Sequence, residues 1–248
     1  MILENLSVDC VIFGFDGANL NVLLWQSELN LIKEFYRDHE DYGQVTELFK
    51  KNPISSDKNA WGLIGSHVPV DEDSDEHAKY ILSTFTSLDN VFLRQVKAFN
   101  EANRVPFQRV VTIAYYALIN PDYHIMKKMD GIKSLKWFNI NSMPKVIFDH
   151  SNIIQEALEK LREEVRYHPV GFHLLPEKFT LTQLQNLYET ILDVELDTRN
   201  FRKKILNMKL LVDTEQKQIN VAHRAARLYE FNLDIYKKLV KEGLNFRI

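Results

Sequence analysis

The strongest constraint on the fold of this chain is a set of helix signals that begins at Thr180. Thr180 is followed three residues later by Gln183, which is the spacing of a capping box. Apolar residues then recur at helical spacing on one face. They are Leu184, Leu187, Tyr188, Ile191 and Leu192. The pattern predicts a helix that packs by one face against a core.

A second helix and a hairpin are expected directly afterwards. Asp197 is a favourable N-cap residue and predicts a helix that continues to about Met208. Residues 210–214 and 227–231 predict two short strands around a polar tip. Helix, short turn, helix and hairpin is the layout of a winged helix-turn-helix domain, in which the second helix enters the DNA major groove.

The charge distribution supports DNA as the partner of this region. Residues 1–170 contain 18 Lys and Arg against 24 Asp and Glu, whereas residues 197–227 contain 8 against 3. Arg and Asn can read bases and Lys suits phosphate. The expected DNA contacts are Thr198, Arg199, Asn200, Arg202, Lys203 and Lys204 in the second helix, and Lys217, His223, Arg224 and Arg227 in the hairpin. The alternative is a protein-interaction module whose basic residues form only a solvated face.

The first 170 residues predict a mixture of strands and helices. Two β-rich runs, 8–15 and 20–25, indicate a hairpin around a turn that contains Gly17. Further strands are expected at 91–99, 109–119 and 135–140, and helices at 75–85 and 151–167. Residues 27–60 form an insertion with a helix expected around 44–51. Pro169 and Gly171 then mark a boundary, so we expect an N-terminal domain at 1–168 and a winged helix at 169–248.

The stretch 61–88 resembles the Nudix box. In that family a glycine and several carboxylates at fixed spacing hold divalent metal ions beside a pyrophosphate, because hard cations require oxygen ligands. Glu72 falls on the first Glu, and Leu82 and Leu88 fit the apolar positions. The other positions differ: Ser66 and Ser87 replace glycines, Tyr80 replaces Arg, and Ile81, Thr84 and Phe85 replace the three remaining carboxylates. The resemblance therefore implies the fold without its catalytic metal.

Other segments resemble Nudix-related transcriptional regulators, in particular 171–176, 179–185 and 199–203. The resemblance implies an α+β protein: a Nudix-like α/β/α sandwich followed by the winged helix. It further implies a homodimer that is no enzyme and needs no cofactor or metal. Its Nudix-like domain would bind a small metabolite and thereby alter operator binding. One branch of these regulators senses ADP-ribose-type ligands, and another senses pentoses such as arabinose and controls carbohydrate use. We expect a pentose here, and ADP-ribose as the second choice.

The effector pocket is expected to involve polar residues of the N-terminal part, namely Asp9, His67, Glu72, Arg109 and Tyr115. A charged residue within a strand either faces solvent or lines a pocket. The pair Asp149-His150 resembles a catalytic pair, but capping of the helix after it explains it equally well. The main rival function is a Nudix hydrolase with an appended interaction domain, and the replaced carboxylates argue against it.

The chain is expected to be cytoplasmic with no membrane partner. No apolar run approaches the roughly 20 residues that span a bilayer, and the N-terminus lacks the basic and apolar regions of a secretory signal. The single cysteine, Cys10, excludes an internal disulfide framework. Because Cys10 lies in an apolar run, we expect a buried, inert thiol.

Overall fold

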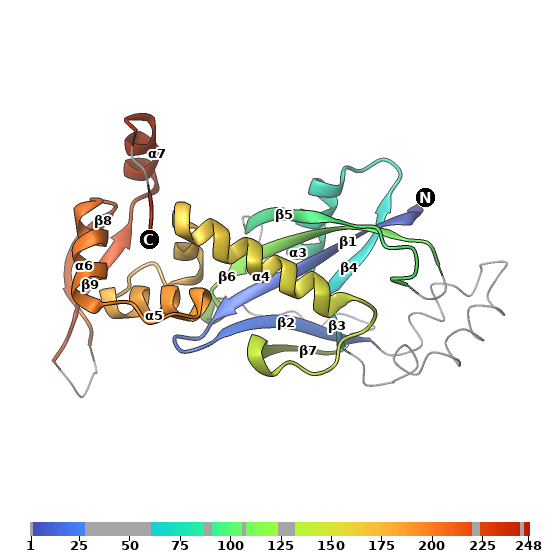
Figure 1. Ribbon diagram of the computed structural model, residues 1–248, viewed down its shortest axis with the longest axis horizontal. Helices are drawn as coiled ribbons and strands as arrows, with labels where there is room; N and C mark the ends of the chain where they lie inside the picture. The colour runs from blue at the N-terminus through green and yellow to red at the C-terminus, as the bar shows by residue number, and fades with distance from the viewer. Residues whose placement is uncertain are drawn as a thin grey trace. The chain divides into compact units, whose positions relative to one another are not determined.

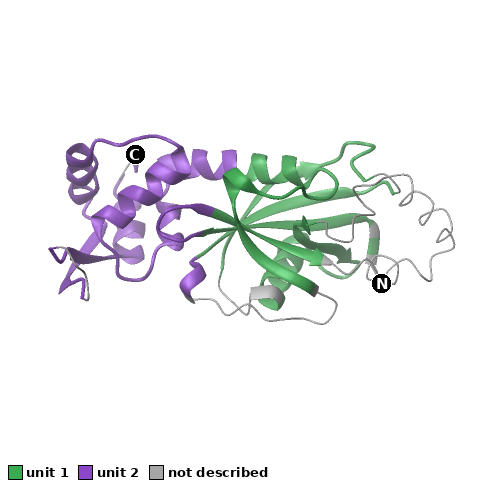
Figure 2. Cartoon of the chain, turned by 90° about the horizontal axis from the view of Figure 1, so that it is seen from below, with its two compact units in different colours: residues 1–14, 21–119, 123–157 green, residues 15–20, 120–122, 158–248 purple. Residues whose placement is uncertain are grey.

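The structure is a computed structural model that describes residues 2–27, 61–86, 91–105, 108–123, 132–219, 224–243 and 246–248. The helix expected around 44–51 lies outside these residues. The chain divides into two compact units (Figure 2), of which the first comprises residues 1–14, 21–119 and 123–157, and the second residues 15–20, 120–122 and 158–248. The division falls within helix α4 (His150–Tyr167). The domain bounds at 168 and 169 stay a prediction.

The first unit is built on a mixed sheet (Figure 1), to which the described residues contribute seven strands. The strands are β1 (Ile2–Phe15), β2 (Leu20–Ser27), β3 (Trp61–Gly62), β4 (Ile64–Pro69), β5 (Phe92–Phe99), β6 (Val111–Ile119) and β7 (Ile132–Asn139). Their order is β3-β2-β1-β6-β5, with β4 paired to β1 and β7 paired to β2. β1 and β6 run parallel, whereas β4 and β1, β5 and β6, and β7 and β2 are antiparallel.

The predicted N-terminal hairpin is confirmed. Gly17 has φ 93°, a left-handed conformation that costs glycine little, and the Asp16 carboxylate accepts the N–H of Asn19 at 2.7 Å. The strands expected at 91–99, 109–119 and 135–140 correspond to β5, β6 and β7. Arg109 was expected within a strand, which is wrong because β6 begins at Val111. β3 and β4 were not predicted.

Two helices cover opposite faces of the sheet. Alternate residues of a strand point to opposite sides, so neighbouring residues of β1 contact different helices. Val8, Cys10 and Ile12 of β1 pack with helix α3 (Ser74–Thr86) in one buried cluster. Asp9 points to the other face, where it lies near His150 at the start of α4. Ile153, Ile154 and Ala157 of α4 are buried. The first unit is thus the expected α/β/α sandwich, and Cys10 is buried, which raises the pKa of its thiol.

The second unit contains the expected helices and hairpin: α5 (Leu181–Leu192), α6 (Thr198–Asn207), β8 (Leu211–Lys217) and β9 (Arg227–Phe231). The capping box is confirmed, since the Thr180 hydroxyl accepts the N–H of Gln183 at 3.1 Å and the Gln183 side chain accepts the N–H of Thr180 at 2.8 Å. Helix α7 (Leu233–Lys241) was not predicted. Short 3-10 helices lie at η1 (Pro121–Tyr123), η2 (Ile140–Ser142) and η3 (Pro169–Leu174).

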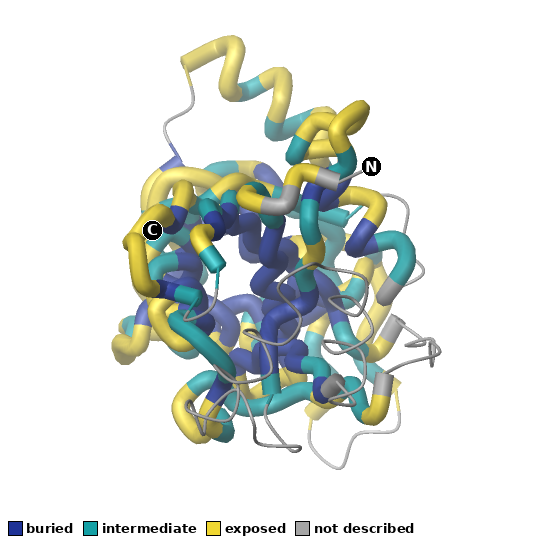
Figure 3. The backbone as a smooth tube through the Cα atoms, turned by 90° about the vertical axis from the view of Figure 1, so that its right-hand side faces the viewer, coloured by how far each residue is buried: buried dark blue, intermediate teal, exposed yellow. Residues whose placement is uncertain are grey.

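The predicted apolar stripe of α5 is buried throughout, from Leu184 to Leu192. Figure 3 colours the tube by burial, with the buried parts in dark blue and the exposed parts in yellow. Within the described parts of the chain, no helix has the length and apolar character to cross a membrane.

Candidate functional sites

The start of α6 is tied to α5 by one buried amide. Gln185 is only 7% exposed, and its Nε2 donates to the Leu196 carbonyl at 3.0 Å and to the Thr198 hydroxyl at 3.1 Å. It also donates to Glu189 Oε1 at 2.9 Å, and the same oxygen accepts the N–H of Leu196 at 2.9 Å. These bonds join the turn between α5 and α6 to both helices.

The outer face of α6 is exposed and basic. Phe201 and Ile205 are buried, whereas Thr198, Arg199, Asn200, Lys203 and Lys204 are all exposed. Arg202 differs from the others because it is half-buried and its Nη2 donates to the Thr182 hydroxyl at 3.0 Å. The structure therefore places Arg202 at the junction of the two helices, beside the first turn of α5.

The hairpin carries the other predicted DNA contacts. Lys217 and Arg227 occupy opposite positions of β8 and β9, and Arg224 is exposed. Arg227 forms an ion pair of 2.7 Å with Asp213. The pKa of Asp213 is lowered, first by the N–H of Glu215 and then by Arg227. His223 lies outside the described residues.

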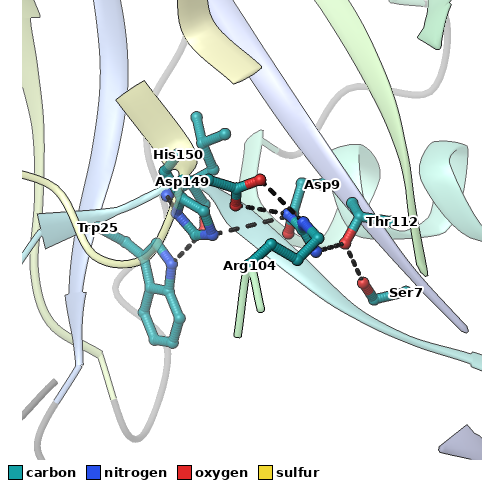
Figure 4. A network of polar contacts seen from close by, with 8 residues as sticks. Ser7, Asp9, Trp25, Arg104, Thr112, Asp149 and His150 are labelled. Atoms are coloured by element: carbon teal, nitrogen blue, oxygen red, sulfur yellow. Dashed lines mark hydrogen bonds and ion pairs between the residues drawn. The ribbon is translucent and has the colours of Figure 1, made fainter. Parts of the chain in front are cut away.

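In the first unit, Asp9 belongs to a buried polar cluster near the starts of α4 and β6 (Figure 4). Arg104 donates two hydrogen bonds to the Asp149 carboxylate, from Nε at 2.8 Å and from Nη2 at 2.7 Å. Its Nη1 donates to Thr112 Oγ1, which lies 2.7 Å from the Ser7 hydroxyl. Bidentate pairing of this kind is among the stronger polar contacts in proteins.

His150 completes this cluster. Its Nε2 lies 3.7 Å from Asp9 Oδ2, and its Nδ1 accepts the N–H of Leu63 at 2.9 Å. Burial lowers the pKa of His150 and raises that of Asp9. Because Nδ1 is an acceptor, the neutral ring carries its proton on Nε2, facing Asp9. Both oxygens of the Asp149 carboxylate accept hydrogen bonds from Arg104, whereas the His150 ring faces Asp9 and Leu63.

Asp9 also faces a position where only glycine fits. Gly65 of β4 pairs with Asp9 across the strands. A Cβ atom on Gly65 would lie 2.0 Å from Asp9 Oδ1 and 2.4 Å from the carbonyl oxygen of Val8. Glycine thus permits the close approach of β4 to β1.

The opposite face of the sheet holds a different polar group. The Tyr115 hydroxyl donates to the Asp75 carboxylate and lies 2.9 Å from the Ser74 hydroxyl. Burial, with the Asp75 hydrogen bond, raises the pKa of Tyr115 to about 12. Glu72 Oε2 lies 2.9 Å from His77 Nδ1, and His77 Nε2 lies 2.8 Å from Ser66 Oγ.

The five residues expected to line one effector pocket are not brought together. Asp9 lies on the α4 face, and Tyr115 belongs to the core cluster on the α3 face. His67 Nδ1 lies 3.2 Å from the Leu6 carbonyl, and exposed Arg109 donates to the Asn100 carbonyl at 2.7 Å. Sequence reasoning overlooked Arg104, His77 and Gln185, because their partners include residues that lie 45, 11 and 13 positions away in the sequence.

Three of the four carboxylate positions of the Nudix box carry no carboxylate. Ile81 is 3% exposed and lies in the core cluster, and Thr84 is half-buried. Glu72 is bonded to His77 instead. Across the described residues, no group of three or more His, Cys, Asp or Glu side chains is arranged to hold a metal ion.

Comparison with known proteins agrees with this arrangement. Residues 171–231 match the model of the NrtR DNA-binding winged helix domain. The ADPR responsive transcriptional repressor NtrR of Acinetobacter baylyi is 31% identical over 202 residues, which cover 79% of each chain. The crystal structure of Shewanella oneidensis NrtR complexed with a 27mer DNA is 26% identical, with a TM-score of 0.72 over 94% of this chain and 96% of that one. A MutT/nudix family protein from Enterococcus faecalis shares the fold, with 20% identity and a TM-score of 0.65 over 94% of this chain and 88% of that one.

The two units and these likenesses define a DNA-binding transcriptional repressor that joins a ligand-responsive Nudix-fold domain to a winged helix. The chain belongs to the NrtR family. The predicted fold class and the predicted regulator are thereby confirmed. The predicted sugar-sensing branch finds no support in these relatives.

Proposed function

We propose that this protein binds operator DNA as a homodimer through α6 and the β8–β9 hairpin, and that an ADP-ribose-type ligand controls this binding. The observation that carries the proposal is the exposed basic face of α6, held in place by buried Gln185, in a chain related to an ADPR responsive repressor.

The geometry of α6 supports the proposed DNA contacts. In a helix-turn-helix the N-terminal residues of the second helix reach the base edges. Arg199 and Asn200 are exposed in the first turn of α6 and can form paired hydrogen bonds with guanine and adenine. Lys203 and Lys204 follow on the exposed side and suit phosphates. Arg202, bonded to Thr182, is suited to a backbone phosphate at the start of α5.

The choice of ADP-ribose as effector rests on sequence similarity to a relative. The Acinetobacter relative is described as ADPR responsive, so we place ADP-ribose ahead of the pentose expected from the sequence. We further propose that the ligand is bound and not hydrolysed, because the box positions that would hold metal are Ile81 in the core and Thr84. No specific observation favours the rival function, which is a Nudix hydrolase with an appended interaction domain.

The test is a reciprocal titration. Duplexes that bind are first selected from a random-sequence library, and ADP-ribose is then titrated with and without the selected duplex. Coupling between two sites typically changes affinity by about 5- to 150-fold, and it must be reciprocal. We expect a change within that range for ADP-ribose and none for arabinose. Equal ADP-ribose affinity with and without DNA would overturn the proposed control.

Thermal unfolding gives an independent measure of the effector. A ligand at 100 times its dissociation constant stabilises the folded state by about 2.7 kcal/mol. We expect ADP-ribose to raise the melting temperature and arabinose to leave it unchanged. A higher melting temperature with arabinose and no change with ADP-ribose would favour a pentose as the effector.

A further inference from the structure

Three side chains of the altered Nudix box form a hydrogen-bonded chain. Ser66 Oγ lies 2.8 Å from His77 Nε2, and His77 Nδ1 lies 2.9 Å from Glu72 Oε2. The order of atoms is that of a serine nucleophile, a histidine base and an orienting carboxylate. Both distances fall within the hydrogen-bond reach that such a relay needs, about 2.6–3.2 Å.

Each member of this relay is held by a different part of the fold. Ser66 lies on β4, where it pairs with Val8 of β1. His77 lies in the first turn of α3, and its ring stacks on Tyr80 at 6.0 Å with an interplanar angle of 22°. Glu72 belongs to the turn between them, and its N–H donates to the Pro69 carbonyl at 3.4 Å. The strand, the turn and the helix thus meet at His77.

The exposure of the three residues also fits a nucleophilic site. The histidine is 4% exposed, so its surroundings hold the ring in place. Ser66 is exposed and open to a reagent from solvent, whereas the Glu72 side chain is 42% exposed.

We propose that Ser66 is an activated nucleophile that accepts acyl groups from small carboxylic esters. The Ser66 oxygen bonds to the ester carbonyl carbon while His77 Nε2 takes the hydroxyl proton, and Glu72 stabilises the resulting imidazolium. The bond to the leaving alcohol then breaks, and the alcohol takes the proton from His77. Water releases the carboxylic acid by the same route and restores Ser66. No metal takes part, so this activity is separate from Nudix chemistry and from the proposed regulation.

The surroundings determine which esters react. Asp71 and Asp73 are exposed on either side of Glu72, and Glu76 follows in the first turn of α3. This negative charge repels anionic substrates. Neutral esters should therefore react faster than esters that carry a carboxylate.

The test uses a fluorophosphonate probe, which forms a stable bond with activated serines, on the full-length protein. We expect mass spectrometry to find the probe on Ser66. Ser66→Ala should abolish the labelling, and His77→Gln should slow it at least 100-fold, since a general base typically contributes about 10²–10⁴-fold. Ser83→Ala is the matched control, because Ser83 lies in α3 with His77 and its hydroxyl donates to the Tyr80 carbonyl. It should label as the parent protein does.

Two further measurements separate chemistry from packing. Glu72→Gln should slow labelling and Glu72→Asp should restore part of the rate, since only a carboxylate stabilises the imidazolium; circular dichroism verifies that each variant is folded. Hydrolysis of p-nitrophenyl acetate should exceed that of the anionic p-nitrophenyl hemisuccinate. Equal labelling of the parent protein and Ser66→Ala, or a probe found only on other residues, would overturn the proposal.

Discussion

The buried amide of Gln185 on α5 donates a hydrogen bond of 3.1 Å to the hydroxyl of Thr198, the first residue of α6. A residue that is only 7% exposed therefore ties the start of the exposed helix to α5. Arg199 and Asn200 follow directly after this contact. Their position thus depends on α5 as much as on α6 itself.

Replacing Gln185 with Leu should weaken DNA binding without removing a DNA contact. The substitution leaves the Leu196 carbonyl and Glu189 without their buried partner, which typically costs about 1–3 kcal/mol. We expect a lower melting temperature and a lower affinity for selected duplexes, with an unchanged salt dependence because no phosphate contact is lost. Parent-like affinity and melting temperature would show that the amide does not position α6.

Arg199→Ala and Lys204→Ala should weaken DNA binding in different ways. Loss of a base-reading arginine should cost about 1–3 kcal/mol and relax specificity at one base pair. Loss of a phosphate contact should weaken all sequences alike and reduce the salt slope by roughly one. Binding of a set of single-mismatch duplexes at several salt concentrations distinguishes the two.

Lys97→Ala serves as the control for these two variants, since Lys97 lies in the other unit and pairs with Glu156. It removes one positive charge and should leave DNA binding unchanged. If Arg199→Ala and Lys204→Ala both bind with parent affinity, α6 does not contact DNA as proposed.

The local signals of the second unit made it the more predictable half of the chain. The capping box at Thr180 and the N-cap at Asp197 act over three residues, so the sequence indicates them directly. Arg104 and Asp149 are 45 residues apart, and no spacing in the sequence joins them. β4 was missed because Gly65, Ser66 and Pro69 give this segment little β-propensity. The sequence could not show that Asp9 and Tyr115 point to opposite faces of the sheet, because that depends on the register between β1 and β6, in which Tyr115 pairs with Cys10.

Acid should destabilise the fold in part through His150. Its pKa is lowered by burial, so the unfolded chain binds a proton more readily than the folded one. The stabilisation that this neutral ring provides is complete above its ordinary pKa of about 6.5 and is lost as the pH falls below that value. Asp9 acts in the opposite sense: its pKa is raised by burial, so its contribution is complete below its ordinary pKa and is lost as the pH rises through the folded value.

Urea unfolding at pH 5.0 and 7.5 measures the His150 contribution. We expect the parent protein to lose more stability at pH 5.0 than His150→Gln, which keeps a polar side chain and cannot be protonated in this range. His168→Gln, a substitution of an exposed histidine, is the control and should follow the parent protein. Equal pH dependence in all three proteins would contradict a role for His150.

The protein should not hydrolyse ADP-ribose in the presence of magnesium or manganese. The assay adds a phosphatase that acts on the hydrolysis products, so that hydrolysis would appear as released phosphate. Nothing at positions 81 and 84 balances the charge of a metal-bound pyrophosphate. Restoring one acid with Ile81→Glu should lower stability and not create activity, because the new carboxylate would enter the core cluster. Metal-dependent release that scales with the amount of pure protein would refute this expectation.

The glycine opposite Asp9 limits how this sequence can diverge. A side chain at position 65 would collide with the main-chain oxygen of Val8 as well as with the carboxylate of Asp9. Shortening Asp9 removes only one of the two collisions, so no second-site change at position 9 can compensate for the loss of Gly65. Asp9 itself is under no such restriction from Gly65. Over evolutionary time position 9 should therefore be free to vary, whereas glycine should be kept at 65 even in relatives that have replaced the aspartate.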